Sequence, residues 1–419
     1  MSSEIKADKW SPASGTSATI GDSGDTYTIP SGVTFTNNGT ANGFGITAAN
    51  FRPNANPLII NGNMDVWQRG TGTVTTTGGY VGVDRFKISE DTDGSYSTQR
   101  HTMSIAELNT TGFGYALQAN CTGTDASIGA SQSAEITQKI EAQNLQLLQY
   151  GTSNAKSITL AFWVKSSKTG TYCIAINKKD STAYNISHEY TISSADTWEK
   201  KVIHISPTAG STSFITSSAG AIANDNGEGL YVVFALAIGS NYHGANNTWT
   251  ASSSLSTSNQ VNWMDNTNNN FYLTGVQLEV GEYTSSTLPP FQHESFGDNL
   301  ARCQRYFVKI ETGGSSSLEM AVNKANPNNY NQSRGVYCLA VPMRSGASTT
   351  LSGTVKAGYL GGDFSLSDQG FSTVAPTYGS TTDRVNIVST YMNQSSNNSQ
   401  HSMMFVLQAS SSLSLDAEL

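Results

Sequence analysis

Between residues 57 and 285 one pattern recurs: short runs of alternating or β-branched apolar residues, each ended by a turn rich in Gly, Asn or Ser. Clear cases are YVGVDRFKI (80–88), WEKKVIHISP (198–207) and NFYLTGVQLEVG (270–281). Successive side chains of a strand point to opposite faces, so each run predicts a strand with one buried face. The continuous apolar run LYVVFALAIG (230–239) predicts a central strand buried on both faces. Strands of this length and spacing favour a two-sheet sandwich of jelly-roll type.

Composition agrees with an all-β chain. Charged residues make up only 13% of the 419 residues, and Ser, Thr, Asn and Gly, which favour turns over helices, take their place. One segment, AEITQKIEAQNLQLLQYG (134–151), fits a helix, but it also fits a strand followed by a short helical turn, which we favour.

The chain is too long for one ordinary core, and we expect four parts. Residues 1–56 hold few apolar side chains. They are either disordered or, as we favour, a β stalk or attachment segment that gains its core by packing in a homotrimer. Residues 57–288 form the jelly roll, and residues 289–307 form a connector with a short helix. Residues 308–419 resume strand-like alternation and predict a smaller C-terminal β-sandwich at the tip.

The connector opens with Pro289-Pro290, which ends the preceding strand by removing backbone donors. Ser295 or Asp298 can cap the short helix. We expect its apolar residues to dock between the two β domains and its arginines to face solvent or a neighbouring subunit. The apolar residues are Leu300, Cys303, Tyr306 and Phe307, and the arginines are Arg302 and Arg305.

Charge and cysteine spacing exclude several partners. The net charge is −8, and the densest basic site is Lys178-Lys179, expected in a loop, so nucleic acid is not an expected partner. The chain has no Cys-x-x-Cys pair, so we expect no structural zinc and mostly buried free thiols. These thiols are Cys121, Cys173, Cys303 and Cys338.

No stretch predicts insertion into a membrane. MSSEIKADKW lacks the apolar core of a signal peptide, and the longest apolar run, Leu230 to Ile238, is too short to span a bilayer. A protein of this kind that works outside a cell is expected to arrive there without ordinary secretion, for example as a virion component released by lysis.

Six segments that follow one another resemble a module of bacteriophage tail-fibre-like proteins, especially marine ones. They are NGNMDVWQRG (61–70), GYVGVDRFKI (79–88), QKIEAQNL (138–145), ITLAFWVKSS (158–167), VNWMDNTNNNFYLTGVQLEVG (261–281) and FQHESFGDNLARCQRYF (291–307). The opening IKADKWSPASG and the ending SLSLDAEL are also similar to such proteins.

This resemblance implies a carbohydrate-binding jelly roll in a homotrimeric virion fibre, assembled in the host cytoplasm and without enzymatic activity. Its N-terminus would attach to other virion tail proteins, and its distal part would bind a host-surface glycan or an outer-membrane receptor. We therefore expect adhesion by a tail fibre. The alternatives are a head fibre or capsid decoration protein with a structural role only and, less favoured, a polysaccharide depolymerase.

Sugar binding needs aromatic faces beside amides or carboxylates. The polar segment 241–270 offers Tyr242, His243, Trp249 and Trp263 as candidates, although the two tryptophans also fit a role in closing the edge of the sandwich. Three further tryptophans lie in strand-like runs and are expected in the core: Trp67, Trp163 and Trp198.

The C-terminal part supplies three weaker candidates for receptor binding, Tyr330, Arg334 and Tyr378, in Asn- and Thr-rich loops. Two groups of carboxylates, Glu90/Asp91/Asp93 and Asp225/Glu228, lie in predicted turns, where Asp is favoured for capping the backbone. We therefore expect no catalytic site and no cofactor. A structural calcium ion is suggested only by analogy with other jelly rolls, because no complete calcium-binding loop is present.

Overall fold

The computed structural model describes residues 57–75, 78–312, 318–323, 333–353, 355–359, 374–376, 384–389, 403–407 and 410–419. The chain divides into two compact units, Met1–Phe51 and Arg52–Leu419, and the described residues all belong to the second. The predicted stalk, residues 1–56, lies outside them. No helix in the described ranges has the length and apolar character needed to cross a membrane.

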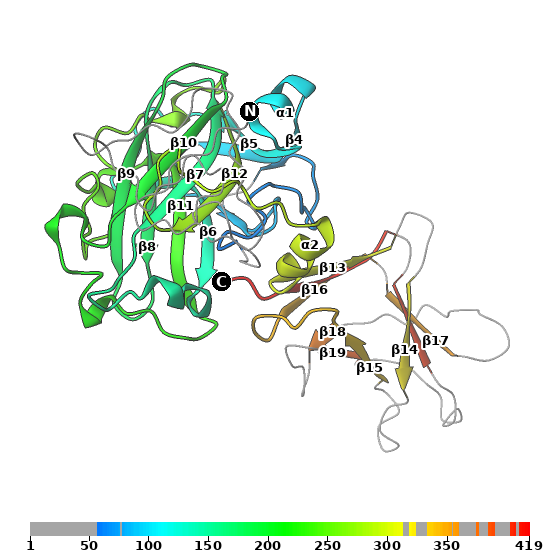
Figure 1. Cartoon of the computed structure of the whole chain (residues 1–419). Coiled ribbons are helices and arrows are strands. Elements are labelled where there is room, and N and C mark those ends of the chain that lie inside the picture. Colours follow the sequence, from blue (N-terminus) through cyan, green and yellow to red (C-terminus); the bar gives the residue numbers. More distant parts are fainter. Residues whose placement is uncertain are drawn as a thin grey trace, which may run out of the picture. The chain divides into compact units, whose positions relative to one another are not determined.

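Two antiparallel sheets of six strands each build the region between residues 74 and 280 (Figure 1). In spatial order, sheet 1 consists of β1 (Val74–Thr75), β4 (Ser95–Thr102), β5 (Tyr115–Gly123), β12 (Asn270–Val280), β7 (Ile158–Ser166) and β10 (Glu199–Ile205). Sheet 2 consists of β2 (Gly78–Gly79), β3 (Phe86–Glu90), β6 (Ser133–Glu141), β11 (Glu228–Ile238), β8 (Gly170–Lys178) and β9 (Tyr184–Ile192).

Two expectations for individual segments hold in this region, but the run 80–88, predicted as one strand, is a strand only from Phe86 onward, because residues 80–85 form bends and a turn. Strand β11 covers the run predicted as a central strand, pairs with both β6 and β8, and is buried along nearly its whole length. Segment 134–151 is a strand, β6, followed by a short 3-10 helix, η2 (Ala142–Leu148), as favoured from its sequence.

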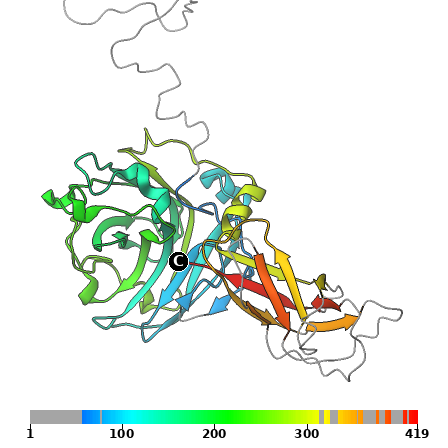
Figure 2. The same cartoon turned by 90° about the horizontal axis from the view of Figure 1, so that it is seen from below.

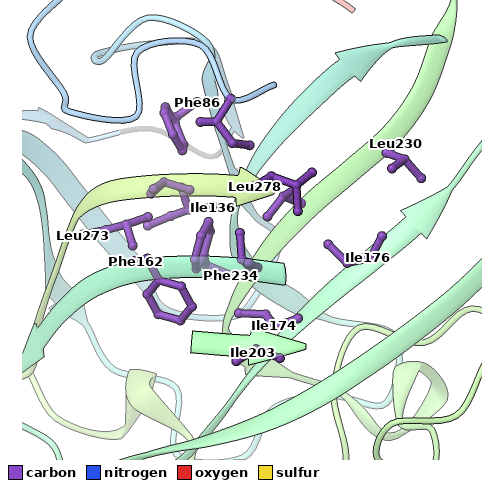
Figure 3. Packing of buried hydrophobic residues seen from close by; sticks show 14 of the residues in the cluster. Phe86, Ile136, Phe162, Ile174, Ile176, Ile203, Leu230, Phe234, Leu273 and Leu278 are labelled. Carbon is purple, nitrogen blue, oxygen red and sulfur yellow. The ribbon is translucent and has the colours of Figure 1, made fainter. Parts of the chain in front are cut away.

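The main core fills the space between the two sheets (Figure 3). Phe162 of β7 meets Phe234 of β11 edge to face, with ring centroids 5.1 Å apart. Around this pair lie aliphatic side chains from both sheets, among them Ile136, Ile174 and Leu273. Their burial removes apolar surface from water and is the dominant force that holds the sheets together.

The helices and tight turns are few and short. Helix α1 (Ile105–Thr111) begins with a capping box between Ser104 and Glu107 and ends at Gly112, which has a φ of 83°. Helix α2 (Phe296–Gln304) is capped by Ser295, whose side chain accepts a hydrogen bond from the backbone N–H of Asp298. The remaining 3-10 turns are η3 (Ala209–Ser211), η4 (Ser218–Gly220), η5 (Ser240–Tyr242) and η6 (Trp263–Asp265).

The C-terminal part of the chain is also built of strands (Figure 2). One sheet has the order β13 (Phe307–Glu311), β21 (Ser412–Asp416), β16 (Ser348–Ser352). The other has the order β17 (Val355–Tyr359), β20 (Met403–Leu407), β14 (Leu318–Asn323), β15 (Ser333–Cys338), β19 (Arg384–Ser389), β18 (Val374–Pro376). The all-β fold class is therefore confirmed.

The connector helix α2 packs against the first of the six ordered segments. Asn299 donates hydrogen bonds to Asn61 Oδ1 (3.3 Å) and Asn63 Oδ1 (3.1 Å). Cys303 and Tyr306 are buried against Ile60 and Val66, as expected for the docking residues of the connector. The three asparagines are buried, and burial of amides is tolerated only because they bond to one another and to the backbone.

The prediction that the connector arginines face solvent or another subunit is wrong. Arg305 binds the buried carboxylate of Glu141 through two hydrogen bonds of 2.7 and 2.9 Å. Arg302 donates to Glu294 and to the backbone carbonyl of Pro57. The reason is geometric: residues 57–60 and the end of β6 lie beside α2, so acceptors are within reach of both guanidinium groups.

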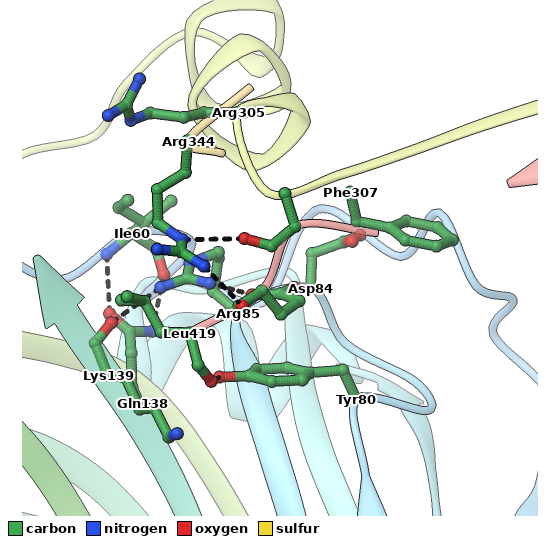
Figure 4. A network of polar contacts seen from close by, with 12 residues as sticks. Ile60, Tyr80, Asp84, Arg85, Gln138, Lys139, Arg305, Phe307, Arg344 and Leu419 are labelled. Atoms are coloured by element: carbon green, nitrogen blue, oxygen red, sulfur yellow. Dashed lines mark hydrogen bonds and ion pairs between the residues drawn. The ribbon is translucent and has the colours of Figure 1, made fainter. Parts of the chain in front are cut away.

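The last residues of the chain return to the loop that precedes β3 (Figure 4). Arg85 forms a buried ion pair with Glu418 and donates to the backbone carbonyl of Lys139. Its guanidinium carbon lies 3.4 Å from the centre of the Tyr306 ring. The motif residue Arg85 thus touches β6, the connector and the chain end together.

Candidate functional site

The predicted binding segment 241–270 lies partly along the outer face of sheet 2. Isolated bridges join Thr250 to Asn185 and Asn246 to Ser187, both of which belong to β9. Tyr242 is half-buried against a small cluster on this face that contains Cys173 and Ala235. His243 is also half-buried, with Nε2 3.0 Å from the carbonyl oxygen of Ile238. The binding role of these two residues stays a prediction.

The two tryptophans of this segment are not available to a ligand, which corrects their inclusion among the binding residues. Trp249 is 1% exposed and Trp263 is 0% exposed. Their indole N–H groups donate to the carbonyl oxygens of Ser206 and Asn270, at 2.9 and 3.1 Å. Each indole has its polar atom satisfied inside the protein, so both close the sandwich, which is the alternative role considered for them.

The other three tryptophans differ in their burial. Trp67 and Trp198 are buried, as expected. Trp163 is only half-buried, because it takes an outward position on β7, between the inward-facing Phe162 and Val164. Its neighbour across the sheet is Thr274 of β12.

Of the C-terminal candidates, Tyr330 and Tyr378 lie outside the described residues. Arg334 belongs to β15, where it pairs with Val388 of β19, and its role in binding stays a prediction. The expectation about the thiols is confirmed for Cys121, Cys173 and Cys303, which are free and buried.

In the first group of carboxylates, Glu90 caps its own turn, as the sequence context indicates, whereas Asp91 and Asp93 bond to residues at or just before the start of β6. Glu90 accepts from the backbone N–H of Thr92 (2.7 Å), and Asp91 accepts from the backbone N–H of Ser133. Asp93 accepts from the side chain of Gln132. Across the described part of the chain, no three His, Cys, Asp or Glu side chains gather in a way that could hold a metal ion.

Helix α1 and Phe113, just after its end, pack on part of the outer face of sheet 1. Helix α1 is attached to it by Glu107, which accepts hydrogen bonds from Lys165 (2.6 Å) and Trp198 (3.0 Å). Burial opposes the charge of Glu107, but the bonds it accepts outweigh this and hold its pKa well below the usual range. At the bulge in β12, the ring of Phe113 lies directly over Gly275.

The outer face of sheet 2 carries charged and aromatic groups next to the 241–270 segment. They point outward because they alternate with the inward-facing Ile88, Ile136, Ile140, Ile176 and Val232. We call this set the Tyr231 face; it consists of Lys87 of β3, Glu135 and Lys139 of β6, Asn177 and Lys179 at the end of β8, and Glu228 and Tyr231 of β11.

Tyr231 is the centre of this face. The ammonium nitrogens of Lys139 and Lys179 lie 4.7 and 5.2 Å from the centre of its ring. Lys139 also donates to Glu228 at 2.7 Å, and the Tyr231 hydroxyl is hydrogen-bonded to the same carboxylate. Burial opposes the charge of Glu228, but these bonds from Lys139 and Tyr231 outweigh it and lower the pKa of the carboxyl. Two ammonium groups thus lie over the aromatic ring of Tyr231 as cation–π partners.

Two buried polar atoms on this face have unused hydrogen-bonding capacity. Neither Asn177 Oδ1 nor Glu135 Oε2 has a hydrogen-bond partner among the described residues. Asn177, 4% exposed, stands opposite Tyr231 in the register of β8 and β11. Burial raises the pKa of Glu135 to about 7, against the opposing effect of Lys87. Both atoms are shielded from solvent, so they are a local cost of the fold and are not open to a ligand in this structure.

Sequence reasoning missed most of this face. It placed Lys178-Lys179 in a loop, whereas Lys178 ends β8 with its ammonium group buried and donating to the carbonyl oxygen of Thr182 (2.9 Å). Tyr231 was hidden in an apolar run. The available signal was that Tyr231 alternates with Val232 and Phe234. If those two side chains point into the core, the Tyr231 side chain must point to the outer face of the sheet.

No protein-family model and no curated protein matches this chain. Among solved structures, the enzymatically active domain of bacteriophage CBA120 tailspike protein 4 is similar, at 12% identity and a TM-score of 0.24, over 54% of this chain and 21% of that one. TmCBM61 in complex with β-1,4-galactotriose matches at 12% identity and a TM-score of 0.26, over 54% and 99%. The family 11 carbohydrate-binding module of Clostridium thermocellum Lic26A-Cel5E matches at 13% identity and a TM-score of 0.25, over 52% and 99%.

The match to the tailspike domain spans about a fifth of that protein's length. The assignment of the fold rests on the strand order and pairing of this chain itself.

Proposed function

We propose that this protein is a bacteriophage tail-fibre adhesin that binds saccharides of the host cell surface through the Tyr231 face. The observation that carries the binding role is the Tyr231 ring with two lysine ammonium groups beside it on the outer face of sheet 2. The sugar's apolar face packs against the ring, and its hydroxyls accept hydrogen bonds from the lysines. The ordered resemblance to tail-fibre modules supports the placement in a virion.

The charges of the face favour an acidic saccharide. Three lysines stand against two glutamates, and Glu135, whose pKa is raised to about 7, is partly neutral at physiological pH. A carboxylate on the ligand therefore meets a net positive surface. Such a site is weak by itself, and repetition within a fibre and among several fibres of a virion supplies avidity.

The binding role is tested with the full-length protein on an array of bacterial-surface saccharides, followed by calorimetry with a uronate-containing oligosaccharide and its neutral analogue. Tyr231→Ala and Lys179→Ala should each weaken binding about tenfold, which corresponds to about 1.4 kcal/mol. Lys200→Ala removes an exposed lysine from sheet 1 and serves as the matched control, with affinity unchanged.

Absence of binding, or equal affinities for all three variants, would contradict the role of the Tyr231 face. The virion placement needs a separate observation. Gold-labelled antibody against the chain should decorate the tail in electron micrographs. Decoration of the capsid would instead support a head fibre or decoration protein.

A further inference from the structure

A concave site lies on a part of the molecule away from the Tyr231 face. Helix α2 and the segment around residues 65–71 enclose a pocket of 470 Å³. Its volume is within the range of small-molecule sites. The residues that matter for its chemistry are Asp65, Gln68, Arg100, Tyr115, Phe296 and Leu300. None of them belongs to the Tyr231 face.

Phe296 gives the pocket an aromatic surface. It is the first residue of α2 and remains 59% exposed, although it is one of the largest apolar side chains in the described chain. The cap by Ser295 fixes the start of the helix, so the position of this ring does not depend on burial. An exposed aromatic ring at the mouth of a pocket is a typical recognition element.

Arg100 supplies donors that the protein itself does not use. Its guanidinium carbon lies 4.4 Å from the centre of the Tyr115 ring. Within the described ranges this guanidinium makes no hydrogen bond and no ion pair, unlike Arg69, Arg85, Arg302 and Arg305. Stacking on Tyr115 holds the group in one plane, with its N–H donors available to a ligand.

Asp65 supplies the complementary acceptor. One oxygen of its carboxylate accepts from Asn63, which fixes the group in the wall of the pocket. Burial raises the pKa of Asp65, and the charges of His293 and Arg100 oppose that rise. The pocket thus pairs one positive group with one negative group beside an aromatic ring.

We propose that this pocket binds a single neutral hexopyranose unit, independently of the Tyr231 face. The apolar face of the sugar packs on Phe296. Ring hydroxyls accept from Arg100 and donate to Asp65, as each hydroxyl can do both. The opposite charges of Arg100 and Asp65 cancel, which suits an uncharged ligand, and Asp65 repels a sugar carboxylate. The Tyr231 face, with its excess of lysines, favours a negatively charged saccharide instead.

The test uses the full-length protein titrated with methyl glucosides and methyl galactosides, and separately with glucuronate, followed by saturation-transfer NMR and calorimetry. Phe296→Ala, Arg100→Gln and Asp65→Asn should each weaken binding of a methyl hexoside about tenfold. Tyr231→Ala should leave it unchanged. Ile105→Ala, which removes an exposed apolar side chain from α1, is the matched control for Phe296→Ala and should also have no effect.

Phe296→Ala changes only a surface side chain, so a loss of binding in this variant cannot be attributed to unfolding. Four outcomes overturn the proposal: no methyl hexoside binds, glucuronate binds more tightly than the hexosides, Phe296→Ala retains full affinity, or Tyr231→Ala abolishes hexoside binding. A change in molar mass on light scattering of Phe296→Ala would also overturn it, because the ring would then belong to a subunit contact. Failure of the Tyr231 face leaves the hexoside measurements unaffected, since the three pocket variants lie outside that face and Tyr231→Ala serves here only as a control.

Discussion

Arg85 and Glu418 are 333 positions apart in the sequence, yet they form an ion pair in which neither side chain keeps more than 5% of its surface exposed. Arg69 binds the same glutamate at 3.4 Å and also Asp84 at 3.2 Å (Figure 4 shows the surroundings of Arg85). The motif VDRF, which looked from sequence like part of a strand, therefore receives the last residues of the chain.

Removing the acidic partner should be costly. Glu418→Gln leaves Arg85 buried without a counter-charge, and we expect a loss of about 3–5 kcal/mol in the free energy of unfolding. Urea denaturation followed by fluorescence measures this loss. The control is Glu311→Gln, which breaks an exposed pair with Lys309 and should cost less than about 1 kcal/mol. Equal effects of the two changes would show that the buried pair contributes little.

Gly275 should not accept a side chain. Its φ is +59°, and a Cβ there would lie 2.5 Å from Cε2 of Phe113 and 3.0 Å from Cδ1 of Trp163. Gly275→Ala therefore combines left-handed strain of about 1 kcal/mol with a steric clash, for a total loss of about 3 kcal/mol. Gly112→Ala isolates the first term, because φ is +83° and no atom lies within 4 Å. Thermal unfolding of both variants should show the larger drop for Gly275→Ala; a larger drop for Gly112→Ala would contradict the packing described at β12.

Glu107 should stabilise the fold only while it is ionised. Its folded-state pKa is held below the value of an unfolded chain, so its contribution is present above about pH 4.3 and is lost as the pH falls below that value. Glu107→Gln should lower the free energy of unfolding by about 2 kcal/mol at pH 7. It should also reduce the decrease in that free energy as the pH falls from 7 to 3. Urea titrations between pH 3 and pH 7, read by tryptophan fluorescence, measure both effects. Glu282→Gln changes an exposed carboxylate and should show the same pH dependence of stability as the wild type. If Glu107→Gln also showed the wild-type dependence at low pH, Glu107 would not be the group that loses its contribution there.

Glu135 should act in the opposite direction. Its folded-state pKa is raised to about 7, so the folded chain is favoured below the unfolded pKa and loses stability as the pH rises toward 7. Glu135→Gln removes this loss, and the gain over wild type should grow to about 3 kcal/mol by pH 8. Denaturation curves at pH 5, 6, 7 and 8 test the trend. A gain that does not change with pH would mean that the carboxyl is not held neutral by burial.

Much of the fold follows from local sequence. The strand β11, the strand–turn form of residues 134–151 and the capped helix α2 were all predicted, because side-chain alternation and capping residues are properties of a few neighbouring positions. The burial of Cys121, Cys173 and Cys303 was also predicted, from their apolar surroundings.

The sites could not be predicted in the same way. Lys139, Lys179 and Tyr231 come from three elements and meet only because β6, β11 and β8 are neighbours in sheet 2. Trp163, expected in the core, is half-exposed, and Trp263, a binding candidate that also fitted a role in closing the sandwich, is buried. A neighbouring loop and the strand register decide which face is covered.

The sequence by itself determined that this chain is built of β-strands and which segments, such as 230–239 and 270–281, form several of them, since periodicity records which side of a strand is apolar. Only the tertiary structure decided which strands are adjacent, which outward residues remain uncovered and which charges are paired. Arg305 and Arg100 illustrate the difference, because the sequence alone does not distinguish their charges. In the structure the Arg305 guanidinium is bound to Glu141, whereas the Arg100 guanidinium stacks on Tyr115 and keeps its donors unused. Pairing depends on what lies within a few ångströms in space, and residue order does not carry that information.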